Sequence, residues 1–133
     1  MRQMQWKYAV AALLCAAGLG LALAQDQGTI PEPVRKAVLK NCAVSGCHMG
    51  ANPAAQLNFE PDKLPGSALD VPSRQKPGLK IIDSAAPQTS YLLMKIRGDK
   101  DIGGRRMPLN GTPLKDAEYK AFHDWIQSLK AKS

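Results

Sequence analysis

The sequence predicts a small all-α domain in which long loops connect three to four helices. Three segments carry apolar residues at helical spacing, and they cover residues 31–41, 88–97 and 115–130. The stretch between the first two segments, residues 49–86, contains five prolines, which exclude a long helix there. The chain has 133 residues, which is enough for one domain.

The N-terminal residues have the composition of an export signal. Arg2 and Lys7 precede an apolar run, residues 9–22, that is too short to span a bilayer comfortably. Ala22 and Ala24 supply the small residues that a signal peptidase reads, so we expect cleavage after Ala24. We therefore expect a signal peptide over 1–24 and a periplasmic domain over 25–133, with an uncleaved anchor as the alternative.

The exported domain is basic and keeps two cysteines. Cleavage removes Cys15 and leaves Cys42 and Cys47, so no odd thiol remains in an oxidising compartment. Of the 18 Lys and Arg residues, 16 remain against 11 Asp and Glu, a net charge of +5. This charge suits an acidic protein partner, and it could equally suit nucleic acid or a membrane surface. Export and the absence of a dense Lys/Arg block argue against nucleic acid.

Each predicted helix has a recognisable start or face. Pro31 and Pro33 fit only in a first turn, so the first helix begins there and runs into Cys42. Pro87 opens the second helix, and Gly98 stops it. The third has the strongest apolar face, made of Leu114, Tyr119, Phe122, Trp125, Ile126 and Leu129.

The first helix leads into the segment Cys42-Ala43-Val44-Ser45-Gly46-Cys47-His48. Its pattern is C-x4-C-H, whereas the familiar attachment signature for c-type haem is C-x-x-C-H. Two thiols add to the vinyl groups of a haem, and the adjacent histidine binds the iron. Gly46 tolerates a positive φ and allows the two additional residues to bulge.

Two other interpretations of this segment stay open. Nearby cysteines in an exported protein often form a disulfide. Cys42, Cys47, His48 and Met49, with Met107, could instead hold copper, because soft sulfur and imidazole ligands suit that metal. Structural zinc usually takes four protein ligands, and no cysteine follows Cys47.

Methionine is the usual second axial ligand of an electron-transfer c-type haem, and Met107 is the preferred candidate. It lies in a glycine-rich loop, and Pro108 stiffens the backbone after it. Met49 is adjacent to the proximal histidine and cannot cross to the opposite face of the porphyrin. Met94 is assigned to helix packing. His123 flanks the apolar face of the last helix and is assigned to the surface.

The long middle loop also favours a large cofactor. A loop of this length without regular structure is unusual in a compact domain. It becomes reasonable if it wraps a flat group that supplies apolar surface itself. Only 5% of the residues are aromatic, and a haem would replace the missing aromatic core.

Together these features resemble an exported bacterial monohaem cytochrome c-like domain, of the class I c-type cytochrome fold, with a wide haem motif. Besides the segment 42–48, the matching pieces are Val71-Pro72-Ser73-Arg74, Ser90-Tyr91-Leu92, Lys95-Ile96-Arg97-Gly98, Arg106-Met107-Pro108-Leu109 and Asp124-Trp125-Ile126. The resemblance covers roughly residues 31–130. It implies one covalent haem c attached at Cys42 and Cys47, with His48 and Met107 as axial ligands of the iron. In such domains a proline carbonyl usually orients the proximal histidine, and Pro53, Pro61 and Pro65 are the candidates.

The expected function is that of a periplasmic single-electron carrier between redox proteins. With both axial positions filled, the iron has no open position for substrate, so we do not expect an enzyme. The alternatives are a periplasmic copper-binding module and, if Met107 does not ligate, a five-coordinate haem protein that acts on a small gas or peroxide. After signal removal we expect no stable membrane insertion.

Overall fold

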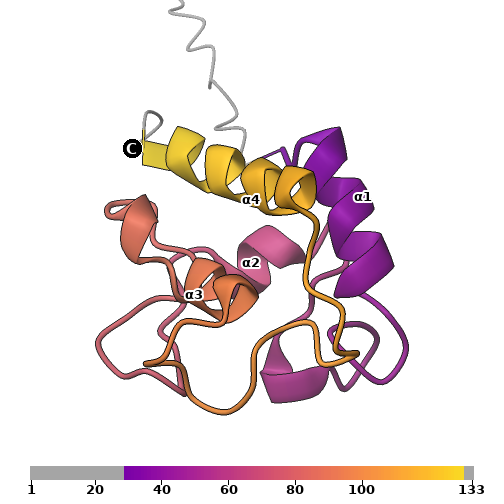
Figure 1. The fold of residues 1–133 in the computed structure, drawn as a ribbon. Helices are drawn as coiled ribbons and strands as arrows, with labels where there is room; N and C mark the ends of the chain where they lie inside the picture. The colour runs from indigo at the N-terminus through magenta and orange to yellow at the C-terminus, as the bar shows by residue number, and fades with distance from the viewer. Residues whose placement is uncertain (1–28, 131–133) are drawn as a thin grey trace, which may run out of the picture.

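The computed structural model describes residues 29–130, so the predicted signal peptide lies outside the described residues. The helices are α1 (Glu32–Asn41), α2 (Leu64–Ala68), α3 (Tyr91–Arg97) and α4 (Asp116–Leu129), with 3₁₀ turns at Ala54–Gln56 and Pro87–Thr89. Figure 1 shows α4 lying across one side of the molecule, above α2 and α3. Residues 29–130 contain no strand, only two isolated bridges, which confirms the all-α prediction.

The core forms where α4 packs against α1 and α3. Helix α4 buries the side chains of Phe122, Trp125, Ile126 and Leu129. Helix α1 buries Val34, Ala37 and Val38. The apolar faces predicted for both helices therefore meet in one core. The observed helices are shorter than the predicted ones by one residue at the start of α1 and by one residue at each end of α4.

A carboxylate joins the end of α1 to the start of α4. Glu118 accepts a hydrogen bond from the backbone N–H of Lys115 at 3.0 Å, and this bond caps α4. The same carboxylate accepts a bond from Lys40 Nζ at 2.9 Å. The Lys115 N–H, followed by Lys40, lowers the pKa of Glu118. The joint links the end of α1, just before the segment 42–48, to the start of α4.

The second helix begins later than predicted. Residues 87–89 form a 3₁₀ turn, and Ser90 has non-helical dihedral angles before α3 starts at Tyr91. The N–H groups of Tyr91 and Leu92 donate to the carbonyls of Lys80 and Ile81, both at 2.9 Å. Because the middle loop takes up these N–H groups, the helix cannot continue back to residue 88.

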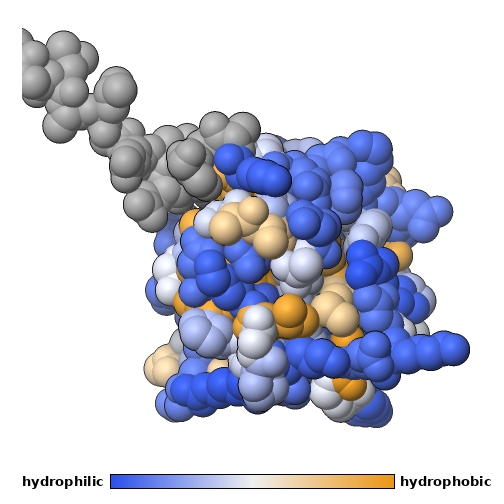
Figure 2. All heavy atoms as spheres, turned by 90° about the vertical axis from the view of Figure 1, so that its left-hand side faces the viewer, coloured by the Kyte–Doolittle hydropathy of each residue, from blue (hydrophilic) through white to orange (hydrophobic). Residues whose placement is uncertain are grey.

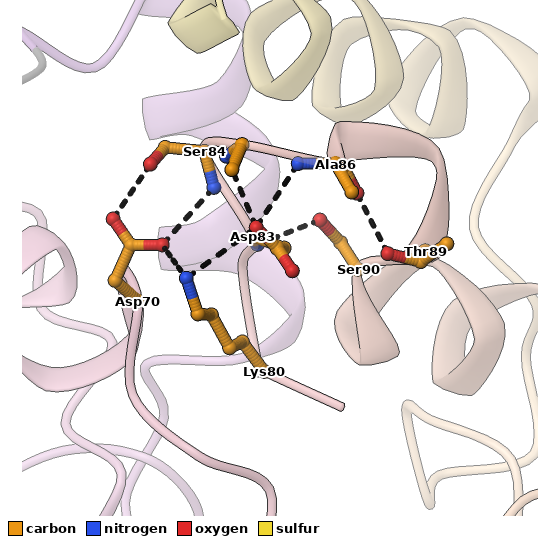
Figure 3. Close-up of polar contacts among 8 residues, drawn as sticks. Asp70, Lys80, Asp83, Ser84, Ala86, Thr89 and Ser90 are labelled. Carbon is orange, nitrogen blue, oxygen red and sulfur yellow. Dashed lines mark hydrogen bonds and ion pairs between the residues drawn. The ribbon is translucent and has the colours of Figure 1, made fainter. Parts of the chain in front are cut away.

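The middle loop is more structured than the sequence predicted. The five-residue helix α2 lies within it, and bridges join Leu69 to Ile82 and Pro72 to Lys80. Figure 3 shows the polar network beyond α2, in which Lys80 donates to Asp70 at 2.8 Å. The same network joins the 3₁₀ turn to the loop, because the N–H of Asp83 donates to Ser90 Oγ at 2.9 Å.

The surface seen from the α3 side is mostly hydrophilic, with hydrophobic side chains showing across its centre (Figure 2). Large hydrophobic side chains that are exposed are those of Leu39, Met49 and Leu109. None of the helices within residues 29–130 has the length and hydropathy needed to cross a membrane.

Candidate haem site

The segment 42–48 forms a closed turn at the end of α1. The N–H groups of Cys42 and Ala43 both donate to the carbonyl of Val38 at 2.8 Å, which ends the helix. The N–H of Cys47 donates to the carbonyl of Val44 at 2.9 Å, and Gly46 has a φ of +76° at the third position of this turn. The N–H of His48 donates to the carbonyl of Cys42 at 3.1 Å. The two additional residues of the motif are thus absorbed in a single turn.

Both thiols are free and partly buried. Burial, with smaller contributions from Cys47 and Glu118, raises the pKa of the Cys42 thiol to about 12. At neutral pH the Cys42 side chain is therefore a thiol and not a thiolate. The disulfide that the sequence left open is not formed in this structure.

Two backbone carbonyls hold the His48 ring. Nδ1 lies 3.1 Å from the carbonyl oxygen of Ala54 and 3.1 Å from that of Leu57. A carbonyl oxygen only accepts, so Nδ1 carries the hydrogen, and in the neutral ring Nε2 keeps its lone pair. The orienting acceptors are therefore these two carbonyls and none of the three candidate prolines, although Ala54 directly follows Pro53.

The loop that carries these acceptors is fixed at several points. The N–H of Ala54 donates to the carbonyl of Cys47 at 2.8 Å, and the N–H of Phe59 donates to the carbonyl of His48 at 2.7 Å. The Glu60 carboxylate accepts bonds from the side chains of Asn58 and Lys63 and from the backbone N–H of Gly50. These bonds, led by that from Asn58, lower the pKa of Glu60 to about 2.

Two adjoining cavities, of about 350 Å³ and about 130 Å³, open beside this loop. His48, Phe59, Leu92 and Met107 line both of them. The smaller cavity is also lined by both thiol residues, Cys42 and Cys47, and by the apolar residues Val44, Ile96, Leu109 and Leu114. The larger one extends to a polar end with Gln56, Arg74, Gln75 and Lys95. All four site residues predicted from the sequence thus line the smaller cavity.

Met107 reaches this region from a loop held against α3. Its backbone N–H donates to the carbonyl of Lys95 at 2.9 Å. The neighbouring Arg106 donates from Nε to the carbonyl of Ile96 at 2.8 Å. The Met107–Pro108 peptide bond is cis. The loop is therefore bonded to consecutive residues of the helix.

The other candidate ligands line neither cavity. Met94 packs against the hydrophobic core, as the sequence indicated. Met49 is exposed. His123 is partly exposed on α4, and its Nδ1 lies 3.2 Å from Asp124.

Sequence reasoning missed several residues of the site. Phe59 lines both cavities, and no motif in the sequence set it apart from the other apolar residues of the middle loop. Lys95 lies among the buried residues of α3, and a lysine between apolar helix residues was the available signal. Arg74 also lines the larger cavity; its segment, 71–74, was part of the resemblance, but nothing in the sequence indicated a cavity there.

The haem and copper interpretations of the segment 42–48 require different arrangements of donors. Among residues 29–130, no three His, Cys, Asp or Glu side chains are grouped so that they could hold one metal ion. A copper ion bound by Cys42, Cys47 and His48 together would therefore require the turn to rearrange. A porphyrin needs instead separate anchors around an apolar space, with a neutral imidazole nitrogen facing the iron. Cys42, Cys47, His48 and Met107 line the smaller cavity together with apolar residues.

Comparison of the chain with protein-family models, with curated proteins and with solved structures found no match in any of the three. A functional proposal for this chain therefore depends on its own residues and their geometry.

Proposed function

We propose that this protein is a c-type cytochrome that carries single electrons between redox proteins of the periplasm. One haem c would be attached through Cys42 and Cys47, with His48 and Met107 as axial ligands. The observation that carries the proposal is that all four residues line the smaller, largely apolar cavity, and His48 and Met107 line the larger one as well. They reach this region from the turn after α1 and from the loop after α3, which are far apart in the sequence.

The state of His48 supports its role as the proximal ligand. Two carbonyls occupy Nδ1, so the lone pair of the neutral ring is on Nε2, the atom that binds iron in this arrangement. A metal-bound histidine typically has such an acceptor on its other nitrogen, which fixes the orientation of the ring and raises its basicity. Stacking on Phe59 restricts the same ring further.

The remaining residues would set the environment of the cofactor. When bound, the haem supplies reversible one-electron chemistry at its iron. Leu92, Ile96 and Leu114 are buried and line the smaller cavity, so they would shield the bound cofactor from water, and such shielding affects the reduction potential. A thioether ligand from Met107 favours the reduced iron. With His48 and Met107 both bound, no position is left for a substrate, so we propose a carrier and not an enzyme.

The charge of the domain supports an acidic redox partner. Lys100, Arg105 and Arg106 lie in the loop that carries Met107, and Lys100 and both arginines are exposed. Exposed cations beside the cofactor would attract an acidic docking surface and speed a short-lived encounter. Such steering weakens as salt is added.

The decisive test is the absorption spectrum of the exported protein, produced together with a haem maturation system, and its pyridine haemochrome. We expect the sharp reduced bands of a low-spin haem with two thioether links. Protein that is exported and folded but carries no haem would overturn the proposal, and the same preparation could then be titrated with Cu(I). A high-spin spectrum would indicate five-coordinate iron and a protein that acts on small ligands.

A further inference from the structure

Lys95 has an unusual position for a lysine. It lies on α3, its side chain is buried with only 6% of its surface exposed, and it lines the larger cavity. Burial lowers the pKa of its ammonium group. A buried ammonium group is costly unless hydrogen-bond acceptors compensate for the lost water, so its partners show what this residue does.

Those partners are backbone carbonyls of the loop that carries Met107. The ammonium nitrogen of Lys95 donates to the carbonyls of Gly103 and Arg105, both at 2.7 Å. The backbone carbonyl of the same lysine accepts the N–H of Met107 at 2.9 Å. Lys95 thus binds alternate residues of the loop, the last of which is the candidate ligand itself.

Neighbouring residues strengthen the first of these contacts. The N–H of Gly103 donates to the Tyr91 hydroxyl at 2.8 Å, and the carbonyl of the same residue accepts the bond from Lys95. Two side chains one helical turn apart on α3 therefore bind both backbone polar groups of Gly103. The Cβ atom of any other residue at position 103 would lie 2.9 Å from Cβ of Gln75, so only glycine allows the two segments to approach this closely. The loop is therefore bonded to α3 on the side that faces the cavity.

We propose that Lys95 is the positioning residue that holds the Met107 thioether at the iron. This inference rests on the proposed function. Lys95 does not bind the iron in this proposal. Its two charge-assisted bonds to carbonyls keep the loop from swinging away, and such bonds are stronger than bonds between neutral groups. Without them Met107 would leave its position more easily, and a competing ligand would replace it more readily.

The test uses the haem-loaded protein with Lys95→Met, which removes the ammonium group and keeps a long side chain. Imidazole is titrated into the oxidised protein, and loss of the near-infrared band of methionine-ligated iron is followed. We expect imidazole to bind at least about tenfold more tightly to the variant, the effect of losing one bond to a charged group. An affinity equal to that of the wild type would overturn the inference.

A matched control is Lys76, a residue of the middle loop that contacts the start of the loop that carries Met107. Lys76 donates from Nζ to the carbonyl of Asp101 at 3.0 Å, but this contact is exposed. Lys76→Met therefore removes the same kind of bond by the same substitution, and we expect its imidazole affinity to equal that of the wild type. An equal increase in both variants would mean a general loosening of the loop and would overturn a specific role for Lys95.

Two further measurements keep the inference testable if Lys95→Met does not fold. Lys95→Gln replaces the ammonium group with a shorter neutral donor, and we expect an intermediate imidazole affinity. In the wild type, hydrogen exchange at the Met107 amide should be as slow as at the α3 amides, and fast exchange there would overturn the inference. A wild type without haem or without the methionine band would contradict the proposed function, while unchanged imidazole binding in a wild type with that band would contradict only the role of Lys95.

Discussion

The ring of His48 stacks on the ring of Phe59, with centroids 4.6 Å apart and planes inclined by 23°. The same two residues are joined through the backbone, because the N–H of Phe59 donates to the carbonyl of His48 at 2.7 Å. Phe59 is also buried in the core, with 5% of its surface exposed. The candidate proximal ligand is thus tied to the core through one residue.

Replacing Phe59 with leucine should therefore destabilise the protein and disturb His48. The loss of aromatic contact and of buried volume should lower the free energy of unfolding by about 1–2 kcal/mol, measured by urea denaturation. The reduction potential of the loaded protein should also change. Tyr119→Leu is the control, because Tyr119 is the aromatic neighbour of the other histidine, His123, at 6.3 Å. A potential that shifts equally in both variants would contradict the role given to Phe59.

Glu60 should make the loop around His48 sensitive to acid. Its pKa in the folded protein is lowered to about 2, against roughly 4.3 in an unfolded chain. A lowered folded pKa adds stability that is complete above the unfolded value and is lost as the pH falls toward 2. Glu60→Gln should therefore lower the melting temperature at pH 6, and the difference from the wild type should shrink between pH 4 and pH 2. A difference in melting temperature that stays constant over this pH range would show that the Glu60 carboxylate does not cause the loss of stability in acid.

Gly98 should not tolerate alanine. It ends α3 with a φ of +78°, and an added Cβ would lie 2.8 Å from Cδ of Arg106 in the loop that carries Met107. Gly98→Ala should lower the free energy of unfolding by about 1–2 kcal/mol, partly because of the left-handed backbone and partly because the arginine is displaced. Gly111→Ala is the matched control, since its φ is +82° but no atom lies within 4 Å. Chemical denaturation of both variants separates the effect of backbone strain from that of the contact with Arg106. Equal losses of unfolding free energy would show that this contact contributes nothing.

The three longer helices, α1, α3 and α4, could be predicted from the sequence, because apolar spacing, prolines and Gly98 act locally. The start of the second helix could not, because it depends on the bonds from Tyr91 and Leu92 to carbonyls of the middle loop. Helix α2 was missed for a similar reason. It is short and contains Pro65 and Gly66, so its stability comes from packing, with Leu64 fully buried, and not from propensity.

The site could be predicted in part. Cys42, Cys47 and His48 are adjacent in the sequence, and Met107 stood out as a loop methionine before proline. The groups that hold them are mostly backbone atoms, such as the carbonyls of Ala54 and Leu57, and residue identity does not reveal them. These contacts form only when distant segments fold together, so they required the structure.

Removing the thiols should test how much of the core the cofactor provides. Cys42→Ala or Cys47→Ala should leave the haem attached by one link or weakly bound. The double variant should be mostly unfolded, because a small domain has little stability to spare and the haem would fill the two cavities. Circular dichroism with haem staining of denatured protein measures both effects. A double variant that keeps its fold and melting temperature would argue against a haem-dependent core.

The axial role of Met107 is tested by three variants of the loaded protein. Met107→Ala should lower the reduction potential, because a thioether favours the reduced iron. It should also open the iron to carbon monoxide or convert it to high spin. Met94→Leu and His123→Asn should change neither property, because neither residue lines the cavities. Electrochemistry and absorption spectra of the four proteins give the comparison.

The oxidised wild type should show the weak near-infrared band of methionine-ligated iron, and among these variants only Met107→Ala should lose it. Because Lys95 bonds the backbone of Met107 to α3, the loop has a defined position from which the side chain reaches the cavities. Loss of the low-spin spectrum in His123→Asn would require α4 to approach the haem and would make the iron bis-histidine. A wild type without the band would leave the sixth position open, and the carrier role would then give way to binding of small ligands.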